Sequence, residues 1–155
     1  YVYGDNAVMT VRRNEHQAAT DRVEKDPGVW KTELSKAARE PEKMVFSYWY
    51  KGTYADRTIR DMDMRFITFE ESTVQNIVFQ NCNLEGSRFP GTRLTGCSFA
   101  GCNLWGADFR ECTLEQTSFA GAELTAAVFP AESVPFLDIS AEQLQVIRLD
   151  REEES

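Results

Sequence analysis

Residues 79–129 read FQNCN LEGSR FPGTR LTGCS FAGCN LWGAD FRECT LEQTS FAGAE LTAAV F, and this stretch decides the fold. Its every fifth residue is Phe or Leu, in strict alternation from Phe79 to Phe129. The same spacing continues upstream through apolar residues to Ile59. A helix repeats about every 3.6 residues and a strand every two. A period of five is neither, and it indicates an internal structural repeat.

Two further positions follow the same period. Glycine lies two residues after the centre in six units, which suits a tight backbone corner. Residues directly beside the centres are mostly polar and are expected to face water. The residue two before each centre is small, as in Cys82, Ser87, Thr92, Cys97, Cys102, Ala107, Cys112, Thr117, Ala122 and Ala127.

The units Cys82–Gly86, Cys102–Gly106 and Ala107–Glu111 resemble the A-(D/N)-(L/F)-x-x motif of the pentapeptide-repeat family. The resemblance covers residues 57–131. It implies a mainly β fold, a right-handed square parallel β-helix in which four pentapeptides make one coil of twenty residues. Met62 and Ile67 are too large for the small position. We therefore expect the first coil to be wider or irregular.

Stacked coils are also what the physics of a short repeat requires. A five-residue unit cannot bury its own apolar side chain, so neighbouring coils must pair their backbones at about 4.8 Å per layer. The repeat predicts about four coils with residues twenty apart in one column. The expected columns are Phe79, Phe99 and Phe119; Phe89, Phe109 and Phe129; and Leu84, Leu104 and Leu124.

Both ends of the repeat are predicted to carry caps, because an exposed β-helix end invites edge pairing. Residues 1–56 form the expected N-terminal capping region: a strand or hairpin, a helix from Asp26 to near Pro41, and a strand over residues 44–50. Residues 132–155 form the expected C-terminal cap and acidic tail. There Ser140 and Gln143 read as the capping box of a short helix. A homodimer through a cap is a further expectation.

Composition limits the function. The chain of 155 residues has a net charge of −8, which argues against a nucleic-acid groove because phosphate contacts need clustered Lys and Arg. It shows no uncharged apolar stretch of about 18 residues and no signal-peptide pattern. The sequence predicts a cytoplasmic protein without a membrane span. Because it begins at Tyr1, a secreted effector or a soluble domain of a larger protein are alternatives.

All four cysteines, Cys82, Cys97, Cys102 and Cys112, fall on the small inward position. We interpret them as structural thiols, since free Cys behaves as a small buried hydrophobe. A disulfide between the column neighbours Cys82 and Cys102 and a zinc site are weaker alternatives. Reduced thiols fit a cytoplasmic location.

Catalytic signals are weak throughout the chain. His16 is the sole histidine, and acid pairs such as Glu70 and Glu71 are expected to be solvated surface. No Walker loop, dinucleotide fingerprint or metal-hydrolase motif occurs. The sequence predicts a protein that is not an enzyme and needs no cofactor or metal.

Trp105 is the most informative outward residue. It follows the centre Leu104, shares a column with Glu85, and lies one corner from Arg110. An aromatic side chain beside a guanidinium is typical of an interface anchor. The alternative is that Trp105 packs against a capping segment. The same two interpretations apply to the aromatic cluster Tyr48, Trp49, Tyr50 and Tyr54.

Two functions follow from these features. The preferred hypothesis is a non-enzymatic interaction module or scaffold, a bacterial pentapeptide-repeat domain that docks a protein partner through an exposed wall with Trp105 and Arg110. The alternative rests on the quinolone-resistance members of the family, which mimic DNA and bind type II topoisomerases. For that role Glu71 and Glu111, which share a column, would dominate. Mixed charges in the outward columns count against it, because a mimic needs a continuous acidic stripe.

Overall fold

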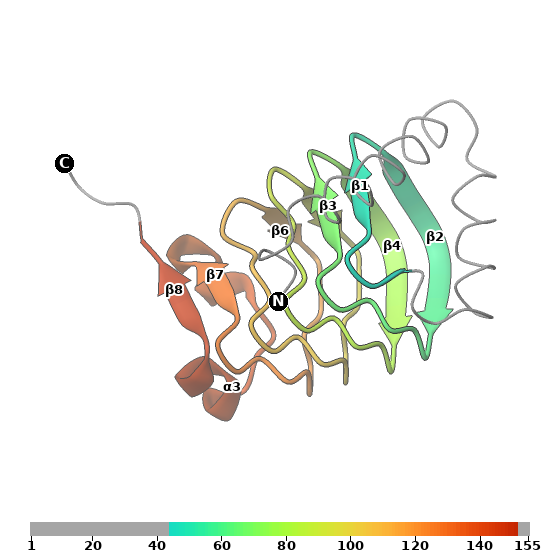
Figure 1. Ribbon diagram of the computed structural model, residues 1–155. Coiled ribbons are helices and arrows are strands. Elements are labelled where there is room, and N and C mark those ends of the chain that lie inside the picture. The colour runs from blue at the N-terminus through green and yellow to red at the C-terminus, as the bar shows by residue number, and fades with distance from the viewer. Residues whose placement is uncertain (1–43, 152–155) are drawn as a thin grey trace, which may run out of the picture.

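The computed structural model describes residues 44–151 (Figure 1). Turns of backbone are stacked along one axis, with β1 and β2 toward one end and β7, β8 and α3 at the other. In chain order the elements are β1 (Tyr48–Tyr50), β2 (Thr53–Arg60), β3 (Thr68–Glu70), β4 (Thr73–Gln80), β5 (Arg93–Thr95), β6 (Thr113–Glu115), β7 (Val128–Pro130), the 3-10 helix η3 (Ala131–Phe136), α3 (Ala141–Val146) and β8 (Arg148–Asp150).

Every strand pair is parallel and joins residues twenty apart. β2, β4, β5 and β6 form one sheet in that order, β1 pairs with β3, and β7 pairs with β8. Isolated bridges such as Asn83 with Asn103 keep the same register between the strands. A chain whose successive turns pair in parallel in this way is a β-helix, and the prediction of a mainly β fold is confirmed.

The five-residue period sorts side chains into those that enter the core and those that leave it. With twenty residues per turn, the centres fall into four columns, and we name each column and its outward face after one member. The Phe89 column holds Trp49, Phe69, Phe89, Phe109 and Phe129; the Leu94 column Tyr54, Val74, Leu94 and Leu114; the Phe99 column Ile59, Phe79, Phe99 and Phe119; the Leu104 column Met44, Met64, Leu84, Leu104 and Leu124.

The predicted phenylalanine stacks are confirmed. The ring of Phe99 lies 4.7 Å from that of Phe79 and 5.5 Å from that of Phe119, centroid to centroid, and the planes are within 8° of parallel. In the neighbouring column, Phe109 stacks at 5.0 Å on Phe89 and at 4.8 Å on Phe129. Rings of the two columns meet edge to face, as for Phe99 and Phe109 at 6.1 Å. Both arrangements are the favourable ones for aromatic pairs.

The corners between columns need left-handed backbone. All six glycines predicted at corners have φ between +64° and +71°. Gly106 has φ +67° with nothing within 4 Å of where its Cβ would lie, so backbone conformation alone accounts for glycine there. At Gly86 a Cβ would lie 2.5 Å from the Phe66 ring, so that ring lies directly against the corner.

The apolar period extends further upstream than the sequence analysis recognised. Trp49 and Tyr54 occupy centres of the first turn, and each is 0% exposed. Neither is therefore an outward anchor. Within the segment read as a strand, residues 48–50 form β1, which pairs with β3. The hairpin and helix predicted before residue 44, and the acidic tail after residue 151, lie outside the described residues.

The C-terminal helix begins as predicted. Ser140 and Gln143 form a complete capping box at the start of α3. The Gln143 side-chain amide also donates to the carbonyls of Phe119 and Ala122 at 2.9 Å, and Asp138 accepts from the Phe119 amide. These side chains thus bond to backbone groups at the last turn of the Phe99 column.

Three of the four cysteines match the predicted burial. Cys82, Cys97 and Cys102 are buried, whereas Cys112 is partly exposed, and all four are free thiols. Cys112 differs because β6 is the last strand of its sheet and η3 follows in place of another strand. Burial, and then the negative charge of Asp108, raise the pKa of Cys112.

We expect one thiol to react in the native protein. Because a thiol reagent needs access to the thiolate, the partly exposed Cys112 should be labelled about tenfold faster than the three buried thiols. Its raised pKa should nevertheless keep the labelling slow. Counting modified thiols by mass spectrometry before and after unfolding checks this. The Cys112→Ser variant should leave no readily labelled native thiol. Rapid labelling of Cys97 in the folded protein would contradict the inward assignment.

Candidate protein-interaction surface

Trp105 stands on the Leu104 face, whose outward column reads Arg65, Glu85, Trp105 and Thr125. The backbone pairs this column turn by turn: the amide of Gly86 donates to the Trp105 carbonyl at 2.9 Å. Trp105 is 48% exposed. Its side chain is therefore largely presented to solvent from a position fixed by the β-helix.

Asparagine side chains hold the backbone of this column in place. The Trp105 amide donates to Oδ1 of Asn103 at 3.0 Å, and the Glu85 amide donates to Oδ1 of Asn83 at 3.2 Å. The two asparagines are themselves joined, Nδ2 of Asn103 to Oδ1 of Asn83, at 3.1 Å. Local side-chain bonds of this kind restrict the backbone. Glu85 and Trp105 therefore sit on a braced surface.

The nearest basic residue in the column is already paired. Nη2 of Arg65 lies 2.8 Å from Oδ2 of Asp63, and Nε makes further contacts to the same carboxylate. The hydrogen-bonded Arg65 guanidinium holds the pKa of Asp63 below its ordinary value, although partial burial opposes this. The pair is formed within one five-residue unit, because both residues flank the same centre and point outward.

A second Asp–Arg ion pair around one centre lies on the Phe89 face. Nη2 of Arg110 lies 2.8 Å from Oδ2 of Asp108, and the Arg110 amide donates to Oδ1 of the same residue at 3.0 Å. Burial acts to raise the pKa of Asp108, but the hydrogen bonds and charge of Arg110, with the charge of Arg88, outweigh it and lower that pKa. The Arg110 side chain is thus turned back onto its own unit.

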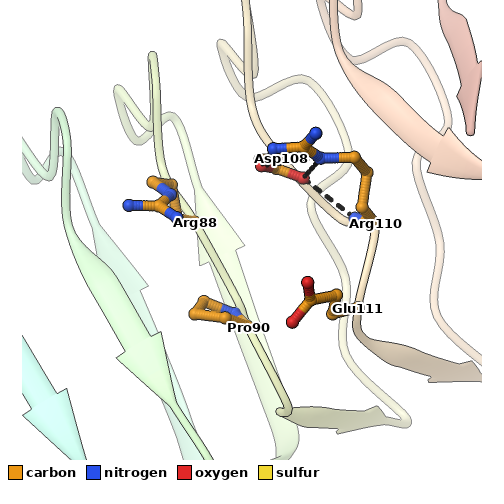
Figure 2. Close-up of a pocket in the computed structure, with 5 residues that line it drawn as sticks. All are labelled: Arg88, Pro90, Asp108, Arg110 and Glu111. Carbon is orange, nitrogen blue, oxygen red and sulfur yellow. Dashed lines mark hydrogen bonds and ion pairs between the residues drawn. The ribbon is translucent and has the colours of Figure 1, made fainter.

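A small, open hollow lies beside this pair (Figure 2). Pro90, one of its lining residues, lies between Glu70 and Arg110 in one outward column. Figure 2 shows Arg110 directed toward Asp108, away from Pro90, while Glu111 extends toward Pro90. The hollow is lined by Arg88, Pro90, Asp108, Arg110 and Glu111, so its charges balance.

The two predicted acidic residues lie in one corner column but are not contiguous. Gly91 separates Glu71 from Glu111: the Gly91 amide donates to the Glu111 carbonyl, and a Cβ on Gly91 would lie 3.3 Å from Cγ of Glu71. Below them Lys51 lies 3.9 Å from the Glu71 carboxylate. The column therefore reads Lys51, Glu71, Gly91, Glu111: one acid is paired with a cation, and an uncharged glycine separates the two acids.

The structure thus brings some of the predicted residues together and separates others. Glu85 and Trp105 are neighbours in one column, whereas Arg110 lies on the adjacent face beyond the corner at Gly106. Sequence reasoning missed Arg88, Pro90 and Asp108. The spacing of Asp108 and Arg110 around one centre was a usable signal, because such residues point to the same side.

Two further observations concern membrane spans and metal sites in the described residues. No helix within residues 44–151 is long and apolar enough to cross a membrane. Over the same range, no three His, Cys, Asp or Glu side chains are grouped so that they could hold a metal ion.

The fold and this surface define a solenoid, a parallel β-helix with polar outward faces. Residues 63–100, 77–116 and 92–129 match the family model for pentapeptide repeats. Residues 63–129 therefore consist of pentapeptide repeats, and this part of the chain belongs to the pentapeptide-repeat family.

Solved structures that match the chain include two trypsin-treated variants of QnrB1, a plasmid-mediated fluoroquinolone resistance protein. They are 13% identical to this chain, with TM-scores of 0.30 and 0.29, and the matches cover 69% and 67% of it. The chain spans 65% of the length of each. A pentapeptide repeat protein of the Arabidopsis thaliana thylakoid lumen is 19% identical, with a TM-score of 0.21, over 59% of this chain and 67% of that one. No curated protein is significantly similar in sequence.

Proposed function

We propose that this protein is a non-enzymatic interaction module that docks a protein partner through the Leu104 face. The observation that carries the proposal is Trp105, a large aromatic side chain about half exposed on a braced, otherwise polar surface. Nothing in the five-residue pattern requires an aromatic residue at that position. Exposed aromatic residues on rigid supports are the usual anchors of protein interfaces.

The finer architecture belongs to the same proposal. We propose a right-handed helix of square cross-section with about four coils, capped by residues 132–155 and by the part of residues 1–56 that precedes the first turn. A homodimer through the C-terminal cap is part of it, supported by the exposed side chains Phe136, Leu144 and Val146 in η3 and α3. The free cysteines support a cytoplasmic location, in a bacterial protein or in a domain of a larger one.

Replacing Trp105 with alanine should separate binding from stability. Immobilised wild-type protein and the variant are used to capture a partner from cell extract, and the purified partner is then titrated against both. We expect about thirtyfold weaker binding, the loss typical of an aromatic hot spot. A matched change on the opposite face, Thr113→Ala, should leave the affinity unchanged. Equal affinity of wild type and Trp105→Ala would refute docking through this face.

The alternative, a DNA mimic that binds type II topoisomerase, draws on the net charge of −8. The interrupted corner column of Glu71 and Glu111 and the internally paired arginines weaken it. A supercoiling assay with purified gyrase decides between the two. Inhibition or protection that is lost on reversing the charge of Glu71 and Glu111 would rank the mimic first.

A further inference from the structure

Glu85 and Trp105 place a carboxylate and an aromatic ring next to each other on the Leu104 face. They are joined through the backbone bond from the Gly86 amide to the Trp105 carbonyl, one turn apart. Successive turns are about 4.8 Å apart. Among residues 44–151, none of the ion pairs involves Glu85, and no cation lies on the Trp105 ring.

Elsewhere in the protein, an aromatic ring and a carboxylate already share a cation. The Lys51 ammonium lies 5.2 Å from the centroid of the Tyr50 ring and 3.9 Å from Oε2 of Glu71. Tyr50 directly follows a centre, as Trp105 does, whereas Glu71 lies in the corner column beside Lys51, one turn further along. A ring on an outward column and a carboxylate in the neighbouring corner column thus share one cation in this fold. On the Leu104 face the ring and the carboxylate belong to one outward column, and no basic side chain within residues 44–151 is paired with either of them.

Within residues 44–151, no basic side chain is placed to complete the Leu104 face. Arg65, the basic residue of that column, is held by Asp63 at 2.8 Å. The position beyond Trp105 is Thr125. This part of the chain therefore leaves the Leu104 face open to a cation from another molecule.

We propose that Glu85 and Trp105 form a receptor for an arginine side chain of the partner protein, an inference that rests on the proposed function. The planar guanidinium can stack on the indole face while its N–H groups donate to the Glu85 carboxylate. The hydrogen bonds from the Glu85 and Trp105 amides to Asn83 and Asn103 hold both backbone positions before the ligand arrives, which lowers the entropic cost of binding. The net charge of −8 attracts a basic segment from a distance.

The test uses labelled hexa-arginine as the probe and fluorescence anisotropy at about 150 mM salt, where distant charges are screened. Trp105→Ala and Glu85→Gln should each weaken binding about tenfold. Trp105→Phe should retain part of the affinity, because phenylalanine keeps an aromatic face. Hexa-lysine should bind more weakly than hexa-arginine, since an ammonium cannot stack as a plane.

Glu115→Gln is the matched control. Glu115 also directly follows a centre, it lies on the opposite face, and its 4.0 Å contact with Arg93 is exposed. Glu115→Gln removes the same unit of negative charge as Glu85→Gln and should change hexa-arginine affinity less than about twofold. If Glu115→Gln weakens binding as much as Glu85→Gln, the probe is held by overall charge and the receptor is refuted. Unchanged binding to Trp105→Ala refutes it as well.

The receptor and the proposed function can fail separately. Suppose that the captured partner loses affinity for Trp105→Ala while Glu85→Gln changes neither that affinity nor hexa-arginine binding. That result would support the interaction module and refute the arginine receptor. Suppose instead that hexa-arginine binding depends on both residues while the captured partner binds wild type and Trp105→Ala with equal affinity. The receptor then exists and the proposed docking face is wrong.

Discussion

Leu104→Asp is expected to leave the protein unfolded. Leu104 is 0% exposed and lies between Leu84 and Leu124 in its column, so a carboxylate there would be buried without a partner. Burying an unpaired charge in a dry core costs several kcal/mol. That is comparable to the whole stability of a typical domain, about 5 to 15 kcal/mol. Far-UV circular dichroism and urea denaturation measure the loss.

The same substitution at Leu144 is the control. Leu144 is 45% exposed in α3 and continues the spacing of the Leu104 column. Leu144→Asp should cost no more than about 1 kcal/mol, as exposed substitutions usually do. A folded Leu104→Asp protein with unchanged thermal stability would show that the register assigned to the core is wrong.

Trp49→Ala should lower the free energy of unfolding by about 3 to 5 kcal/mol, the usual cost of truncating a buried aromatic residue. The Trp49 side chain is fully buried, its Nε1 donates to Oγ of Ser47 at 2.9 Å, and its ring meets Tyr54 edge to face at 5.9 Å. Denaturant titration of wild type and variant gives the difference directly.

Trp105→Ala provides the comparison, because it removes the same side chain from an outward position. We expect a change within about 0.5 kcal/mol there. A small effect at Trp49 would mean that the first turn lies outside the cooperative core. If Trp105→Ala lowered the free energy of unfolding by several kcal/mol, Trp105 would be a packing residue and not a binding anchor.

Much of the fold could be predicted because its rule is local. The centres, the small inward residues and the corner glycines each recur every fifth residue, so a single unit assigns its own side chains to core, corner or solvent. The start of the repeat was harder to see. Trp49 and Tyr54 keep the spacing, but the Phe and Leu alternation is absent there, and Arg57 stands where a small residue is expected.

The candidate site was only partly predictable. Given the twenty-residue register, Glu85 and Trp105 had to be neighbours, and so the anchor and its adjacent acid were found. Arg110 was expected beside Trp105 on an exposed wall, yet its guanidinium pairs with Asp108. The spacing around one centre indicates that these two side chains point to the same side, but whether they bond depends on their rotamers, which a residue pattern does not contain.

The sequence by itself determined which side chains face inward, because that depends on position within five residues. Only the tertiary structure decided how exposed each residue is and which charges remain unpaired, because both depend on the turn twenty residues away. Cys112 obeys the inward rule and is nevertheless partly exposed, since η3 follows where another strand would cover it. Glu85 is available to a ligand for the converse reason: the adjacent turns place Trp105 on one side of it and, on the other, an arginine already bound to Asp63.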